Sequence, residues 1–169
     1  ASGLASLLAD CRLDYLALGG PGERQTVAMK TGIAHHPGAA QAITVDETGP
    51  RGCTLVEIDQ AGELKTSFVP TAAVRRERFD IPIDAHTADR QLGDRMRETL
   101  HRRAPEAGEK VWLVEWVLRG DGPLFESLRN ESFRERLFED IGLGRLEPGG
   151  IPVIHSCRII TPGAPGASG

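Results

Sequence analysis

The five histidines are the side chains best suited to metal binding or proton transfer, and the sequence scatters them. His35 and His36 are adjacent, and neighbouring side chains of a strand point to opposite faces, so the two rings cannot bind one ion together. We expect hydrogen-bonding roles for this pair, with a replacement metal ligand as the alternative. His86 and His101 fall beside and on a predicted helix, where we expect solvated roles. His155 falls in the last predicted strand, as a core or edge side chain.

The three cysteines, Cys11, Cys53 and Cys157, are the next candidates for metal or nucleophilic chemistry. They are odd in number, widely spaced and each within an apolar stretch, which is typical of reduced thiols in a cytoplasmic protein. The sequence contains no C-x-x-C pair, so a cysteine zinc site is not expected. We therefore predict that all three are buried packing residues.

Carboxylates and glycines give weaker signals. Asp10 and Asp14 flank the first predicted strand and Glu47 falls in a turn, where helix capping and turn hydrogen bonds explain them; convergence for acid–base work is the alternative. The loop G-G-P-G at residues 19–22 matches neither G-x-G-x-x-G nor the Walker pattern. It breaks the chain after the first predicted strand, and we interpret it as a loop that has lost its ligand residues, with anion binding as the alternative.

Arginine is the remaining functional signal, with 17 Arg against 3 Lys. Guanidinium groups match the geometry of phosphate oxygens, and an arginine cluster near residue 75 suggests contacts to a DNA backbone. The candidates are Arg24, Arg75, Arg76 and Arg78. The alternative is that the clustered arginines pair with Glu77, Asp80 or a helix carboxylate at the surface.

Composition sets limits on these hypotheses. The chain has 169 residues, 40% hydrophobic and 26% charged, with a formal net charge of −4, which is typical of a soluble globular protein. An acidic chain is not a generally basic nucleic-acid-binding protein, so any DNA contact must come from a local patch. No apolar run approaches the ~18 residues of a membrane span, and no secretory leader opens the chain, so we expect a cytoplasmic protein.

The first part of the chain, residues 1–74, is predicted to form one helix followed by a β-meander. The helix covers residues 2–9, where leucines recur at helical spacing. Short strands are predicted at residues 13–18, 26–29, 33–35, 53–59 and 64–69, with a hairpin turn at 59–62. A meander of this size leaves one sheet face bare, so we expect a missing partner layer.

The second part, residues 75–161, is predicted to be a compact α+β unit of order β-α-β-α-α-β. Its strands are expected at residues 78–83, 111–119 and 151–161, with Pro82 on an edge strand. Thr87 is predicted to cap a helix that ends near residue 104, Pro123 to open a short helix and Asn130 to cap a third. Residues 162–169 contain only Pro, Gly, Ala and Ser and are predicted to be disordered.

Two segments resemble a known family. Residues 14–25 read D-Y-L-A-L-G-G-P-G-E-R-Q, and residues 36–41 and 46–53 read H-P-G-A-A-Q and D-E-T-G-P-R-G-C. They resemble D-Y-x-A-L-G-H-x-H-x-x-Q, P-G-N-x-Q and N-E-T-G-x-K/R-G-C of the calcineurin-like metallophosphoesterases of the DNA-repair exonuclease branch, the bacterial SbcD-type nucleases. Residues 75–161 are similar in element order to the capping domain of that family, including R-G-x-x-P-L at residues 119–124.

The resemblance implies the C-terminal portion of a metallophosphoesterase β-sandwich followed by a capping domain. For an intact family member it implies phosphodiester hydrolysis with manganese or similar divalent metals, and an SMC-like ATPase partner. The two histidines of G-H-x-H fall on Gly20 and Gly22, which have no side chain to bind a metal, and the motifs G-D-x-x-D and G-N-H-D/E do not occur in this chain. Two-metal hydrolysis needs ligands from several such motifs.

We therefore expect a segment without catalytic activity by itself, whose partners are DNA, the ATPase or the missing N-terminal catalytic half. The alternative is a non-enzymatic module that binds DNA or a protein. A purely structural domain without a ligand is a third hypothesis.

Overall fold

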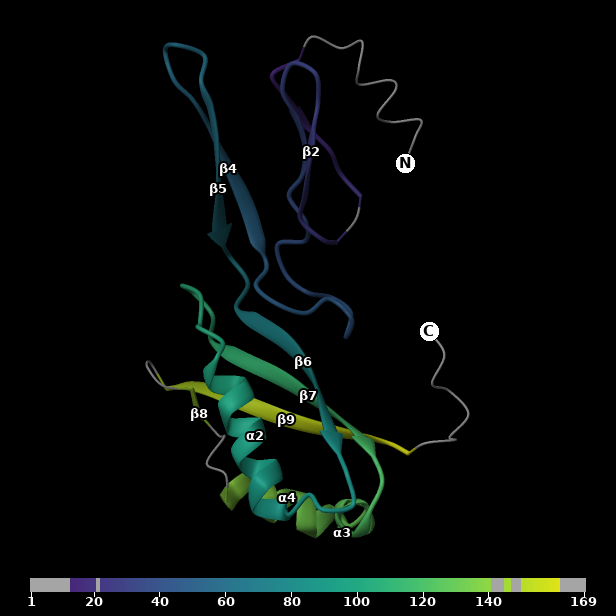
Figure 1. Ribbon diagram of the computed structural model, residues 1–169. Helices are drawn as coiled ribbons and strands as arrows, with labels where there is room; N and C mark the ends of the chain where they lie inside the picture. The colour runs from purple at the N-terminus through teal and green to yellow at the C-terminus, as the bar shows by residue number, and fades with distance from the viewer. Residues whose placement is uncertain (1–12, 21, 141–144, 147–149, 162–169) are drawn as a thin grey trace. The chain divides into compact units, whose positions relative to one another are not determined.

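The computed structural model of the chain describes residues 13–20, 22–140, 145–146 and 150–161 (Figure 1). The chain divides into two compact units, Ala1–Ala72 and Ala73–Gly169. Strands occur in both units, and the helices of the described residues all lie in the second. The predicted α+β class is confirmed at this level. The helix predicted at residues 2–9 and the tail at 162–169 lie outside the described residues.

The first unit contains two small sheets. Three strands form one sheet in the order β1-β3-β2, and β4 and β5 form a hairpin. Their bounds are Tyr15–Ala17 (β1), Gln25–Ala28 (β2), Ile33–His36 (β3), Gly52–Ile58 (β4) and Leu64–Pro70 (β5). The predicted hairpin turn is confirmed, because Asp59 Oδ1 accepts hydrogen bonds from the backbone N–H groups of Ala61 and Glu63, both at 2.8 Å.

Strand pairing in the three-stranded sheet differs from the predicted meander. β1 pairs with β3 in parallel, and β2 pairs with the other side of β3 in antiparallel fashion, so the consecutive strands β1 and β2 are not neighbours. Parallel strands need a long connection, and here the β2 strand with its flanking turns supplies it. The prediction was wrong because strand order depends on contacts distant in sequence.

The first unit has few large buried side chains. Among its described residues, the buried hydrophobic side chains are alanines only: Ala34, Ala42 and Ala72. Leu55 and Val69, on one face of the β4–β5 hairpin, are exposed. Cys53 is exposed on that same face, so the prediction that it is buried was wrong. The missing partner layer of this unit stays a prediction.

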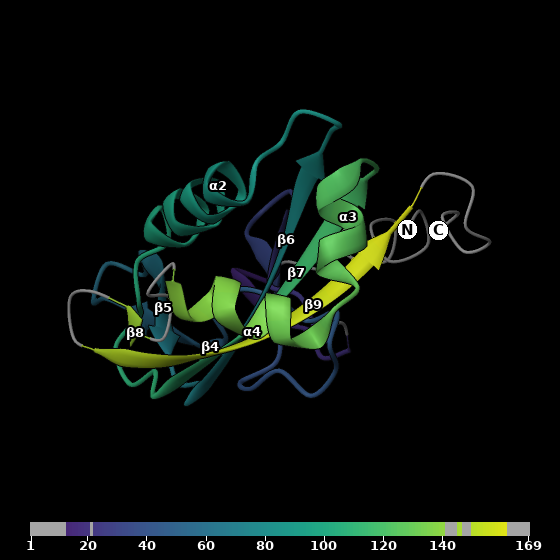
Figure 2. The ribbon, with the colours of Figure 1, turned by 90° about the horizontal axis from the view of Figure 1, so that it is seen from below.

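The second unit is a four-stranded sheet with helices on one face (Figure 2). The sheet order is β6-β7-β9-β8; β6, β7 and β9 run parallel and β8 runs antiparallel to β9. The strands are Val74–Ile83 (β6), Val111–Gly120 (β7), Arg145–Leu146 (β8) and Ile151–Ile160 (β9), and the helices are Asp89–His101 (α2), Pro123–Leu128 (α3) and Glu131–Asp140 (α4). Each parallel connection contains one or two helices, as a crossover requires. Pro82 lies on the edge strand β6, as expected.

One hydrophobic core fills the space between the sheet and the helices. Trp112 and Trp116 of β7 are completely buried in it, together with Leu92, Met96 and Leu100 of α2. The alternation of side chains along each strand directs one set to the helices and the other set to the helix-free face. The sheet therefore has a helix-covered face that holds the unit together and an opposite face that none of the described helices of this unit covers (Figure 2).

Two of the three predicted helix starts are confirmed. Pro123 occupies the first turn of α3, and Asn130 Oδ1 accepts the backbone N–H of Phe133 at 3.3 Å. Thr87 does not cap α2: its hydroxyl donates a hydrogen bond to Asp84 Oδ1 at 3.0 Å, and the residue before the helix is Ala88. The hydroxyl oxygen instead accepts the backbone N–H of Asp84 at 3.1 Å, so Thr87 stabilises the turn before the helix. No helix of the described residues is both long enough and apolar enough to cross a membrane.

Candidate functional site

The helix-free face of the second unit gathers four arginines from three adjacent strands. We call this surface the arginine face and define it by its charged residues: Arg76, Arg78 and Asp80 of β6, Glu115 and Arg119 of β7, and Arg158 of β9. The register aligns Arg78 with Glu115 and Asp80 with Val117 across the β6–β7 pair. Sequence reasoning singled out Arg76 and Arg78 but missed Arg119 and Arg158. The period-two alternation of β7 and β9 is the signal that could have found them.

Ion pairs on the arginine face leave it positive. Glu115 lies between two guanidinium groups, 2.6 Å from Arg78 Nε and 2.7 Å from Arg158 Nη2. Asp80 pairs with Arg119. Two carboxylates thus face four arginines, an excess of two positive charges on one face of a chain whose net charge is −4. The side chain of Arg158 is 57% exposed and can contact a partner without leaving Glu115.

Arg76 differs from its neighbours on this face. Its Nε is buried and has no hydrogen-bond partner among the described residues. Its register partner on β7 is Leu113, which offers no acceptor. A buried donor without a partner is unfavourable for folding.

Arg75, a predicted DNA contact, is buried on the opposite face, so this prediction was wrong. Its guanidinium lies 2.5 Å from Glu77 Oε1, donates to Ala104 O at 3.0 Å and lies 3.5 Å from Glu109 Oε1. Its Cζ is 4.1 Å from the centre of the Trp112 ring. Only 5% of the side chain is exposed. Side chains alternate along β6, so Arg75 faces the helices while Arg76 lies on the opposite face. Arg75 therefore belongs to an internal ion-pair network.

Arg24, the remaining predicted DNA contact, lies in the first unit at a polar cleft of about 390 Å³. Its guanidinium lies over the ring of Phe68, 4.4 Å from the ring centre. The cleft is also lined by Thr26, Thr54 and Thr66. Arg24 thus belongs to a different unit from the other three candidates.

His35 also lines this cleft and is 3% exposed. Its Nδ1 is 2.8 Å from Thr26 Oγ1 and its Nε2 is 2.8 Å from Thr54 Oγ1, so one ring links β2 to β4. Burial lowers the pKa of His35, and the positive charges of Arg24 and His36 lower it further. The expected hydrogen-bonding role is confirmed for His35. Both ring nitrogens are engaged, which leaves none for a metal in this arrangement.

The positions that resemble the family's histidine ligands lie in the loop after β1. Gly20 has a φ of +126°, a backbone conformation that strains any other residue. At Gly22 a Cβ would collide with Oε1 of Glu47. Glu47 Oε2 accepts the backbone N–H groups of Thr44 at 2.9 Å and Ile43 at 2.6 Å, and these hydrogen bonds hold the pKa of the carboxyl below its usual value. This loop is thus arranged around glycine, with Glu47 as a turn residue, as expected.

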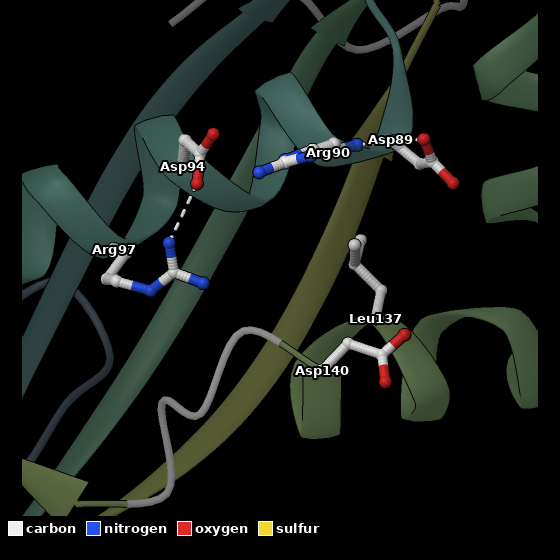
Figure 3. A pocket seen from close by; sticks show the side chains of 6 residues that line it. All are labelled: Asp89, Arg90, Asp94, Arg97, Leu137 and Asp140. Carbon is white, nitrogen blue, oxygen red and sulfur yellow. Dashed lines mark hydrogen bonds and ion pairs between the residues drawn. The ribbon is translucent and has the colours of Figure 1, made fainter.

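A third polar surface is the groove between α2 and α4, about 340 Å³ in volume (Figure 3). Its lining includes Asp89, Asp94 and Arg97 from α2, with Leu137 and Asp140 from α4. Arg97 is paired with Asp94 at 2.7 Å, and the carboxylates do not converge. Within the described part of the chain, no group of three or more His, Cys, Asp or Glu side chains is arranged to hold a metal ion.

The other predicted chemical residues have local roles. His155 is half-buried, and its Nδ1 accepts a hydrogen bond from Trp116 Nε1 at 3.0 Å, which agrees with the expected core or edge side chain. His86 and His101 are exposed, as expected for solvated side chains. Cys157 packs partly buried against the core, and this burial raises the pKa of its thiol to about 11. Cys11 and Asp10 lie outside the described residues.

Comparison with known proteins adds no relative: no protein-family model, curated protein or solved structure matches the chain. Any assignment of function therefore depends on the residues and geometry described above.

Proposed function

We propose that the chain is the C-terminal part of a DNA-repair-exonuclease-like metallophosphoesterase, and that its second unit binds the phosphate backbone of DNA through the arginine face. The observation that carries the proposal is the excess of two positive charges across three adjacent strands, built from Arg76, Arg78, Arg119 and Arg158. Arginine contacts to phosphate fix position without reading bases. Binding is then weak, indifferent to sequence and strongly dependent on salt.

The proposal includes no hydrolysis by this chain alone. Glycine occupies both positions that resemble the family's histidine ligands, Gly20 and Gly22. Manganese or similar metals, an SMC-like ATPase partner and the N-terminal catalytic half belong to the intact enzyme in this proposal. Incubation of the purified chain with linear duplex DNA and manganese is expected to leave the DNA uncut, and metal-dependent cleavage would contradict this part.

Fluorescence anisotropy with a short labelled duplex at several salt concentrations tests the DNA contact. The variant Arg76→Gln/Arg158→Gln removes two guanidinium groups from the arginine face and leaves Glu115 paired with Arg78. Neutralising each phosphate contributes a slope of about −0.9 in log K against log salt, so the variant should flatten the slope by up to about two units.

A matched control removes the same charge elsewhere. Arg102 and Arg129 form exposed pairs with Glu98 and Glu126 on α2 and at the end of α3. Arg102→Gln/Arg129→Gln should leave the slope unchanged. Equal effects of the two double variants would mean that binding depends only on the net charge of the protein, and would refute the site. Absence of binding by the wild-type protein at low salt would also refute it.

One observation favours the alternative, a protein-binding module. Ile154 lies on the same helix-free face, beside Leu113, and is 59% exposed. An exposed aliphatic residue among arginines is also typical of a protein interface. Binding of a protein partner would be lost with Ile154→Ser and would depend little on salt, whereas DNA binding would respond to the arginine variant and not to Ile154→Ser.

A further inference from the structure

The polar cleft of the first unit contains a positively charged side chain that plays no part in the DNA contact proposed for the second unit. Its charged side chain is Arg24, and no hydrogen bond or ion pair of Arg24 with another described residue is present. Phe68 supports the guanidinium from one side, at 4.4 Å from Cζ to the ring centre. Stacking on an aromatic ring orients a guanidinium and leaves its N–H edge free for a planar set of acceptors.

The hydroxyl groups around Arg24 are oriented by His35. A neutral imidazole has one N–H donor and one acceptor nitrogen, and the two nitrogens of His35 contact Thr26 and Thr54, both at 2.8 Å. One of these threonines therefore accepts from the ring and keeps its own hydroxyl proton for another partner. This holds for either tautomer, because the two threonines only exchange roles.

Thr66 adds a further donor to the cleft. It lies on the same face of the β4–β5 hairpin as Thr54 and Phe68, because Thr54 pairs with Phe68 and Thr66 pairs with Val56 in the register. Its hydroxyl makes no hydrogen bond to another described residue. Among the described residues that line the cleft there is no carboxylate, so none of these side chains offsets the charge of Arg24.

We propose that this cleft binds a phosphate group, with Arg24 as the cation and the hydroxyls of Thr66 and of Thr26 or Thr54 as donors. A guanidinium with hydroxyl donors suits a compact anion that has several acceptor oxygens. The phosphate belongs either to a free phosphate or monoester or to a nucleic-acid backbone. The site lies in the first unit and does not depend on DNA binding by the second.

The test is a titration of the isotope-labelled full chain with inorganic phosphate at constant ionic strength, followed by amide NMR. We expect saturable shifts confined to residues near 24–26, 35, 54 and 66–68, with a Kd on the order of 1 mM. Arg24→Gln should weaken binding by about tenfold or more, since hydrogen bonds from a charged donor are the strong ones. Thr66→Val, an exposed change that leaves the fold intact, should weaken it by about threefold.

Lys65→Gln is the matched control, because Lys65 precedes Thr66, points to the other face of β5 and carries the same charge as Arg24. It should leave the Kd unchanged. Absence of saturation with phosphate, or equal losses in Arg24→Gln and Lys65→Gln, would overturn the proposal. Arms with thymidine 5′-monophosphate and with a short single-stranded oligonucleotide identify the source of the phosphate. Tighter Arg24-dependent binding of the oligonucleotide assigns the backbone, and preference for the monoester assigns a free phosphate.

Discussion

The internal ion-pair network around Arg75 gives the sharpest test of the fold. Arg75→Met keeps most of the aliphatic volume and removes the charge. The variant leaves the carboxylates of Glu77 and Glu109 without their cation in a region where their side chains are 7% and 1% exposed. Breaking a buried ion pair by removing one partner costs about 3–5 kcal/mol, because the remaining charge is uncompensated.

Other contacts adjust this magnitude only slightly. Loss of the guanidinium contact with Trp112 adds to the cost, since such contacts contribute about 0.5–2 kcal/mol. Glu109 keeps two other donors, the indole N–H of Trp112 at 2.8 Å and the backbone N–H of Glu106 at 3.0 Å, which moderates its desolvation. The expected loss remains about 3–5 kcal/mol, a large share of the ~5–15 kcal/mol that stabilises a typical domain.

Denaturant unfolding followed by tryptophan fluorescence measures this loss selectively. Both tryptophans of the chain, Trp112 and Trp116, belong to β7, so their emission reports the second unit alone. The matched control is Arg76→Met, one residue along the strand and on the opposite face. Its Nε has no partner among the described residues, so we expect a change below about 1 kcal/mol.

The difference in unfolding free energy between the two variants tests which face of the sheet each arginine occupies. A similar loss of stability in Arg75→Met and Arg76→Met would refute the assignment of the two side chains to opposite faces. A loss below about 1 kcal/mol for Arg75→Met would show that the network contributes no net stability.

Four further predictions follow from the described contacts. Leu100→Ala should lower the free energy of unfolding of the second unit by about 2–5 kcal/mol in the same assay, because Leu100 is completely buried in the core. Thiol labelling with peptide mapping at pH 8 should modify Cys53 quickly and Cys157 only after unfolding, because Cys53 is exposed and the pKa of Cys157 is raised to about 11. The pKa of His35 is lowered in the folded state, so the unfolded state binds the proton more readily. The stability of the first unit should therefore fall as the pH drops below about 6.5 toward the folded pKa. NMR spectra recorded against pH should show this dependence, and His35→Gln should remove it. Residues 73–169 alone should unfold cooperatively by circular dichroism, whereas 1–72 alone should not, because the core of large side chains lies in the second unit.

Much of the local structure could be predicted from the sequence, because hydrophobic periodicity is a local property. The strand at residues 111–119 and the helix that carries Leu92, Met96 and Leu100 were both predicted, with ends that differ by a few residues. The strand predicted at 78–83 in fact begins at Val74. The prediction missed its start because Arg75 and Glu77 interrupt the apolar alternation, although both lie on the apolar face. Glu109, a partner of Arg75, is more than thirty residues away in the sequence.

The candidate sites were predicted only in part for the same reason. The arginine cluster was visible in the sequence, but which of its members are exposed depends on the face that each one occupies. In β4 the alternating sets Cys53–Leu55 and Thr54–Val56 have similar polarity, so the sequence could not show which set faces the cleft. The contact between Arg24 and Phe68 joins segments more than forty residues apart, and no local pattern encodes it.

The division of the sheet into two faces makes the second unit sensitive to the length of its strands. A single-residue deletion within β7 would move Trp116 to the helix-free side and bring Glu115 or Arg119 against the helices, because side chains alternate with a period of two. Substitutions at Arg119 or Arg158, in contrast, change surface charge without touching the core. Relatives of this chain are therefore expected to vary in residue type on the arginine face while they keep the number of residues in β6, β7 and β9. Insertions should be confined to the loops that join these strands to the helices.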